Sequence, residues 1–187
     1  MQQSDIECLK TLIEEIKLSN KASKAEKIMH LLSMDFWITH YQDKKTRCTV
    51  IAACNQFEYP HEHHTCKKLA AAGYNVILVP KGFFKRKEKK FDVFLCRGHI
   101  FLESDLKCIT TTNVDTIGKR IKEGSEQSPR IVLDVTSTIT KNNLIIGLKT
   151  GCERNQNLME IILFYNSNFY CLPKTQILSK KIFKVIK

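Results

Sequence analysis

Three charged side chains between residues 92 and 107 have the types and spacing that phosphodiester hydrolysis requires. Asp105 and Lys107 lie two residues apart on one expected strand, so their side chains share a face, and Asp92 lies on the expected strand before it. Two carboxylates from adjoining strands can hold a hard cation such as Mg²⁺ or Mn²⁺ beside a phosphate. A nearby lysine can orient or deprotonate water and offset transition-state charge. We interpret Asp92 and Asp105 as metal ligands and Lys107 as the cationic helper.

Two other carboxylates bear on this site. Glu62 lies near the start of an expected helix and is predicted to be an outer-shell or second-metal ligand. Glu103 shares the strand face of Asp105 and competes with it for the metal position. Charged groups crowded on one strand face are costly unless they are solvated, paired or bound to metal. An exposed edge strand would show the same alternation of charged and apolar residues. The spacing by itself therefore does not distinguish a metal site from an edge strand.

Alternating strands and helices are expected to position these residues, which predicts an α/β protein with a mixed sheet flanked by helices. Apolar residues at helical spacing over 4–34 predict an N-terminal helical extension, followed by a turn over 42–47. We therefore place the domain boundaries at 1–45 and 46–187. The basic tail from Lys174 is expected to be helical. Expected strands cover 48–54, 74–80, 91–96, 99–107, 130–135, 158–165 and 169–172, and helices cover 61–73, 113–127 and 141–150.

The charge of the chain points to a polyanionic partner. A net charge of +11 and a pI near 9.3 favour capture of nucleic acid, whatever the fold. Basic residues alternate with Phe83 and Phe84 in an expected loop over 81–90, which suits phosphate contact and base stacking, although a solvated loop would have the same composition. The basic residues assigned to nucleic-acid binding are Lys81, Lys85, Arg86 and Lys87.

Cellular location is predicted from what the sequence lacks. The longest apolar stretches are strand-sized, which predicts no membrane partner, and no secretory signal is visible at the N-terminus. The eight cysteines form no CxxC pair and several fall inside apolar segments, which favours buried, reduced thiols. Both observations predict a cytoplasmic protein.

The histidines leave two alternatives open. His61, His63, His64 and Cys66 could supply half of a zinc site, although no second pair occurs at a recognisable spacing. The same histidines, or His99, could act as acid and base in a ribonuclease that needs no metal. A third possibility is a nucleic-acid- or partner-binding protein without catalysis.

The order of these motifs resembles the PD-(D/E)xK phosphodiesterase superfamily, and most closely the C-terminal toxin nuclease domains of bacterial contact-dependent growth inhibition proteins and related mobile-element domains. The likeness runs from Thr49 to Val135 and leaves the N-terminal helices outside. Phe91 replaces the proline that often precedes the aspartate, and Asp105 stands where glutamate is commoner. The matching residues include Glu62, Cys66, Leu69, Gly73, Pro80, Asp92, Asp105, Lys107, Ile117, Ile121, Gly124, Gln127 and the strand Arg130 to Val135.

The resemblance implies a restriction-endonuclease-like core in which Glu62, Asp92, Asp105 and Lys107 inherit the acidic and lysine roles. Gln127 matches a helper polar group and is assigned to nucleic-acid contact. The implied activity is a toxin-like, Mg²⁺- or Mn²⁺-dependent endonuclease acting on RNA, with transfer RNA favoured, or on DNA. A cognate immunity protein is an implied partner, and the cytoplasm of a target cell is an implied site of action.

Overall fold

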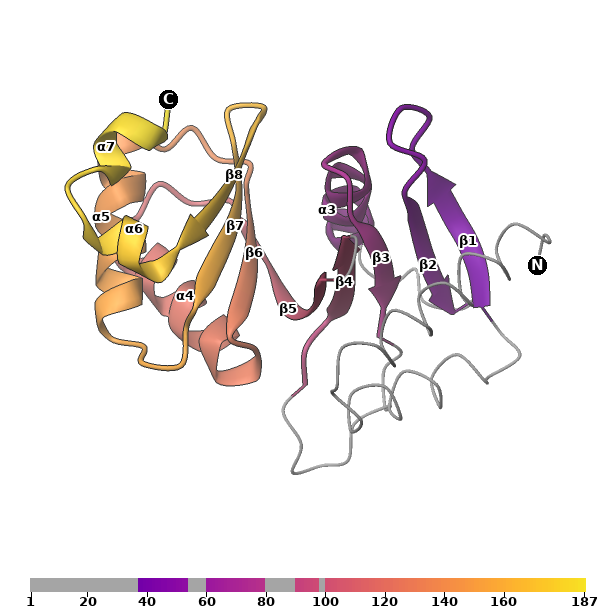
Figure 1. Cartoon of the computed structure of the whole chain (residues 1–187). Helices are drawn as coiled ribbons and strands as arrows, with labels where there is room; N and C mark the ends of the chain where they lie inside the picture. Colours follow the sequence, from indigo (N-terminus) through magenta and orange to yellow (C-terminus); the bar gives the residue numbers. More distant parts are fainter. Residues whose placement is uncertain (1–36, 54–59, 80–89, 98–99) are drawn as a thin grey trace. The chain divides into compact units, whose positions relative to one another are not determined.

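The computed structural model describes residues 37–53, 60–79, 90–97 and 100–187 (Figure 1). The chain divides into two compact units, the first comprising residues 1–86 and 93–102 and the second residues 87–92 and 103–187. Each unit contains a mixed sheet with helices, so the predicted α/β class and helix-flanked mixed sheet are confirmed. The division falls at different residues from the boundary expected after residue 45.

The first unit contains four strands within its described residues, in the order β1-β2-β3-β4. β1 is antiparallel to β2, β2 is parallel to β3, and β3 is antiparallel to β4. α3 provides the crossover between the parallel strands β2 and β3, as parallel pairing requires. The elements are β1 (Trp37–Gln42), β2 (Thr49–Ala53), α3 (Pro60–Ala71), β3 (Asn75–Leu78) and β4 (Val93–Arg97).

β1 corrects the sequence interpretation, because it lies within residues 1–45, where only helices and a turn were expected. The turn after it is confirmed: Asp43 Oδ1 accepts hydrogen bonds from the backbone N–H groups of Lys45 (3.0 Å) and Thr46 (2.8 Å). Such Asx contacts stabilise tight turns. The helices expected over 4–34 lie outside the described residues and stay a prediction.

The second unit carries the crossover architecture that positions the candidate site. Its strands follow the order β5-β6-β7-β8, with β5, β6 and β7 mutually parallel and β8 antiparallel to β7. The helix and strand expected over 113–127 and 130–135 are confirmed, as is the helical tail. The elements are β5 (Ile100–Ile109, in this unit from Glu103 onward), α4 (Val114–Gln127), β6 (Arg130–Val135), α5 (Lys141–Glu153), β7 (Glu160–Tyr165), β8 (Asn168–Pro173), α6 (Lys174–Leu178) and α7 (Ile182–Val185).

The helices of this unit share one hydrophobic core with its sheet. Ile117 and Ile121 of α4 are fully buried with Ile131 and Leu133 of β6, and residues of α5, β7, β8, α6 and α7 complete the cluster. The side chain of Asn113 begins α4 by accepting hydrogen bonds from two backbone N–H groups of its first turn. Burial of one amphipathic face therefore fixes α4 against the sheet.

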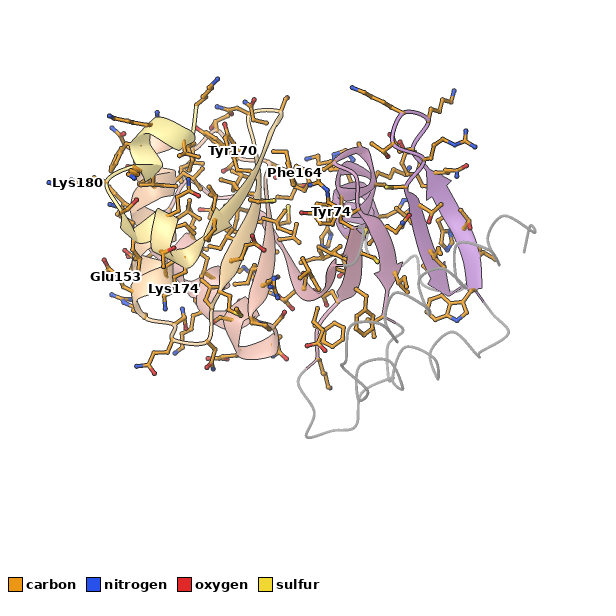
Figure 2. The ribbon with its side chains drawn as sticks, in the orientation of Figure 1. Tyr74, Glu153, Phe164, Tyr170, Lys174 and Lys180 are labelled. Carbon is orange, nitrogen blue, oxygen red and sulfur yellow. The ribbon has the colours of Figure 1, made fainter. Side chains whose placement is uncertain are left out.

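Side-chain contacts also hold the C-terminal segment in place. Lys174 Nζ donates a 2.7 Å hydrogen bond to the carbonyl of Asn155, which connects the start of α6 to the loop after α5 (Figure 2). Within the described residues, no helix is long and apolar enough to cross a bilayer.

Close packing of α4 on α5 predicts opposite effects for two glycine-to-alanine changes. A Cβ at Gly151 would lie 2.7 Å from Cδ1 and 2.8 Å from Cβ of Ile121, whereas a Cβ at Gly118 would meet Thr150 Cγ2 at an ordinary 3.5 Å. We expect Gly151→Ala to lower the free energy of unfolding by about 1–3 kcal/mol through overpacking. We expect Gly118→Ala to raise it by about 0.5–1 kcal/mol through helix propensity.

Urea unfolding followed by circular dichroism measures both changes. Equal effects of the two substitutions would contradict the close approach of the two helices.

Candidate functional site

The carboxylate of Asp105 is buried beneath the C-terminal half of α4. Asp105 is only 2% exposed on β5, and a Cβ added at Gly124 would lie 2.9 Å from its Oδ2 atom. The crossover from β5 through α4 to β6 brings Gly124 over this strand, since Asp105 is the register partner of Ile131. Glycine therefore leaves the space that the Asp105 carboxylate occupies.

Asp92 lies just before β4 and is fixed against β5 by two hydrogen bonds on either side of Asp105. Its backbone N–H donates to the carbonyl of Ser104 (3.2 Å), and its Oδ2 accepts from the backbone N–H of Leu106 (2.7 Å). The carboxyl groups of Asp92 and Asp105 are within hydrogen-bonding reach of each other. The structure thus brings together the two residues that the sequence predicted as metal ligands.

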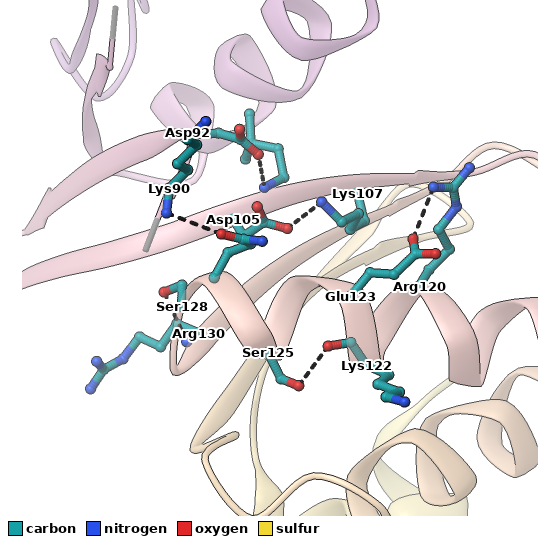
Figure 3. Close-up of polar contacts among 12 residues, drawn as sticks. Lys90, Asp92, Asp105, Lys107, Arg120, Lys122, Glu123, Ser125, Ser128 and Arg130 are labelled. Atoms are coloured by element: carbon teal, nitrogen blue, oxygen red, sulfur yellow. Dashed lines mark hydrogen bonds and ion pairs between the residues drawn. The ribbon is translucent and has the colours of Figure 1, made fainter. Parts of the chain in front are cut away.

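Lys107 completes the group, because its Nζ forms an ion pair with Oδ2 of Asp105 (Figure 3). The Lys107 side chain is 19% exposed, so the ammonium group is near the surface while the carboxylate is not. Burial, together with a smaller effect of repulsion from Asp92, raises the pKa of Asp105 to about 7, although Lys107 acts in the opposite direction. A protonated Asp105 would also donate a hydrogen bond to Asp92.

Two adjacent carboxylates with one lysine suit a hard divalent cation. Like charges at hydrogen-bonding distance repel strongly in a buried site, and either a shared proton or a cation relieves the repulsion. Their oxygens are the ligands that Mg²⁺ and Mn²⁺ prefer, and such ions keep several waters in place of further protein ligands. Within the described residues no third histidine, cysteine or carboxylate side chain joins Asp92 and Asp105 in a metal-binding arrangement, so a cation held by these two carboxylates and by water stays a prediction.

Two polar residues at the end of α4 attach the carboxylate-bearing segments to this helix. Gln127 Oε1 accepts a 3.0 Å hydrogen bond from the backbone N–H of Lys90, and Ser128 Oγ donates a 2.7 Å hydrogen bond to the carbonyl of Glu103. Sequence reasoning found Gln127 but assigned it to nucleic acid. It missed Ser128, because a lone serine at a helix end gives no signal beyond capping.

The remaining predicted site residues are two glutamates in the described part of the chain and four basic residues outside it. Glu62 lies in the first turn of α3 and belongs to the first unit, so its approach to Asp92 stays a prediction. Glu103 is half-buried and its carbonyl is the acceptor for Ser128, while its competition for the metal position stays open. The basic loop residues lie outside the described residues: Lys81, Lys85, Arg86 and Lys87.

The histidines considered for zinc binding all lie on α3. His61 and His64 are exposed, while His63 packs edge-on against His40 with ring centroids 6.0 Å apart. Burial lowers the pKa of His63, and the charges of Lys67 and His40 lower it further. In the part of the chain that the structure describes, no group of three or more histidine, cysteine or carboxylate side chains is arranged to hold a metal. Zinc binding at these histidines therefore gains no support.

No family model, curated protein or solved structure matches this chain. The resemblance drawn from the motifs therefore stays an expectation.

The raised pKa of Asp105 predicts how stability depends on pH without divalent metal. Because the folded pKa (about 7) exceeds the usual value of 3.8, the folded protein binds this proton more tightly than the unfolded chain between these values. The free energy of unfolding should therefore fall as pH rises from about 4 to about 7. Above about pH 7, Asp105 should cause no further decrease in the free energy of unfolding. Each pKa unit corresponds to about 1.4 kcal/mol.

Urea unfolding in EDTA at several pH values, compared with Asp105→Asn, isolates this contribution. The variant should gain stability relative to the wild type as pH rises, and Glu126→Gln on the exposed face of α4 should not. A constant difference between the wild type and Asp105→Asn across the pH range would refute the prediction.

Proposed function

We propose that the second unit carries the active site of a metal-dependent endonuclease that hydrolyses phosphodiester bonds in RNA, with transfer RNA favoured, or in DNA. The observation that carries this proposal is the pair of carboxyl groups of Asp92 and Asp105 within hydrogen-bonding reach, with Lys107 against them. A purely structural ion pair needs one carboxylate for one lysine. The second carboxylate, which belongs to the half-buried Asp92, raises the electrostatic cost of the site and suits a site that binds a cation.

The roles of the residues follow from their positions. Asp92 and Asp105 would hold the cation, which when bound polarises the phosphoryl oxygen and acidifies a water. Lys107, paired with Asp105 and 19% exposed, is placed to orient the attacking water and to donate to a phosphoryl oxygen. The net charge of +11 would draw a polyanionic substrate toward the site.

The order of the elements supports the restriction-endonuclease-like core as part of this proposal. α3, β3, β4, β5, α4 and β6 follow one another as a helix, three strands, a helix and a strand. Asp105 lies on the third of these strands, as the resemblance implies, whereas Asp92 lies one residue before the second strand, on which it was expected. The toxin-like role, the immunity protein and action in a target cell's cytoplasm belong to the same proposal.

Cleavage assays on the full chain test the proposal directly. We expect transfer RNA or DNA oligonucleotides, labelled at one end, to be cut in Mg²⁺ or Mn²⁺ and to stay intact in EDTA. Asp105→Asn should lower the rate by about 100-fold or more, because a metal ligand is lost while the side-chain shape is kept. Cleavage that persists in EDTA would favour the histidine ribonuclease, and salt-sensitive binding without cleavage under either metal would favour a binding module.

Lys107 separates a catalytic contribution from general attraction of nucleic acid. Lys107→Met should lower kcat by about 100-fold with little change in KM, since the ammonium group acts on the reacting phosphate. Lys122→Met removes the same charge from the exposed face of α4 and should leave kcat unchanged. Similar losses in the two variants would show that Lys107 contributes only to the overall positive charge.

A further inference from the structure

We infer that Ser128 and Gln127, at the C-terminal end of α4, are positioning residues that hold the two cation-binding carboxylates together. This inference rests on the proposed function, because it concerns the same pair of carboxylates. Each residue contacts the backbone of one carboxylate-bearing segment, two residues before its aspartate. Neither contact involves the carboxylates themselves, so both residues act through backbone placement.

Ser128 secures the segment that carries Asp105. It is fully buried, and its Oγ donates a 2.7 Å hydrogen bond to the carbonyl of Glu103. The same Oγ accepts a 3.2 Å hydrogen bond from the backbone N–H of Arg130, the first residue of β6 (Figure 3). One hydroxyl therefore connects β5 to the junction between α4 and β6, and a buried hydroxyl with both partners satisfied is costly to remove.

Gln127 secures the segment that carries Asp92. Its Oε1 accepts a 3.0 Å hydrogen bond from the backbone N–H of Lys90, which lies on the short segment before β4. Asp92 is itself outside any strand and depends on such contacts for its position, together with its own bonds to Ser104 and Leu106. This contact gives Gln127 a positioning role, and the nucleic-acid contact expected from the sequence stays a prediction.

The two contacts matter together because the carboxylates repel each other. Without a cation, repulsion favours any movement that separates the Asp92 and Asp105 side chains. Cation affinity depends on ligand oxygens held within a fraction of an ångström, and residues behind the ligands commonly set this placement. Gln127 and Ser128 are adjacent at one end of α4, so together they fix the segments that carry the two aspartates relative to the same helix.

Binding of Mn²⁺ to the full chain, followed by electron paramagnetic resonance, tests this inference without an activity assay. We expect Ser128→Ala and Gln127→Met each to weaken Mn²⁺ binding by about 10-fold or more, the effect typical of residues that orient metal ligands. Gln127→Met keeps the length and helix propensity of glutamine but removes the acceptor. Urea unfolding of each variant ensures that binding is compared between folded proteins.

Ser125 provides a matched control on the same helix. It is also buried, but its Oγ donates to the carbonyl of Lys122 within α4 (Figure 3). Ser125→Ala should therefore leave Mn²⁺ affinity unchanged even if it lowers stability. Weakened binding in Ser128→Ala and Gln127→Met, but not in Ser125→Ala, supports the inference.

Two results would overturn the inference: a wild-type chain that binds no Mn²⁺, or variants at 127 and 128 that lose stability but keep wild-type affinity. Failure of the proposed function looks different. In that case Mn²⁺ binds, the two variants weaken it, and no nucleic acid is cleaved.

Discussion

The stability of the second unit depends on how the fold accommodates the buried carboxylate of Asp105. Removing an ionised group from water is costly, and here Asp92 adds repulsion while Lys107 is the compensating charge among the residues that the structure describes. The raised pKa of Asp105 reflects this imbalance. Such a site persists because the hydrophobic core around it is stable enough to hold the group in place, which is how proteins commonly retain strained functional groups.

The packing of α4 determines whether that accommodation is possible. Close approach of α4 to α5 relies on Gly151, whose missing side chain leaves room for Ile121. About one helical turn after Ile121 on α4, Gly124 also lacks a side chain and so leaves room for the Asp105 carboxylate. The helix is therefore seated by its apolar face against the core, and its polar end, Gln127 and Ser128, reaches the strand segments that carry the carboxylates.

Sequence reasoning succeeded where local signals and burial agree. Helical periodicity predicted α4, the apolar residues Ile131 to Leu133 predicted β6, and the Asp105–Lys107 spacing predicted their shared face. It failed for β1, because the half-buried residues 37–42 mix polar and apolar side chains without clear alternation and the antiparallel pairing with β2 decides their structure. Ser128 was missed because its contact with Glu103 joins residues 25 positions apart.

A structural role for Asp92 would explain only part of this arrangement. Its Oδ2 satisfies the backbone N–H of Leu106, and the neutral amide oxygen of asparagine would satisfy it equally well without repelling Asp105. Lys107 likewise needs only one carboxylate as its partner. The excess negative charge at this point has no benefit for folding, since it raises the pKa of Asp105 and lowers stability at neutral pH. The divalent cation that we propose at this site would reverse that sign, because each ligand charge that opposes folding would then strengthen its binding.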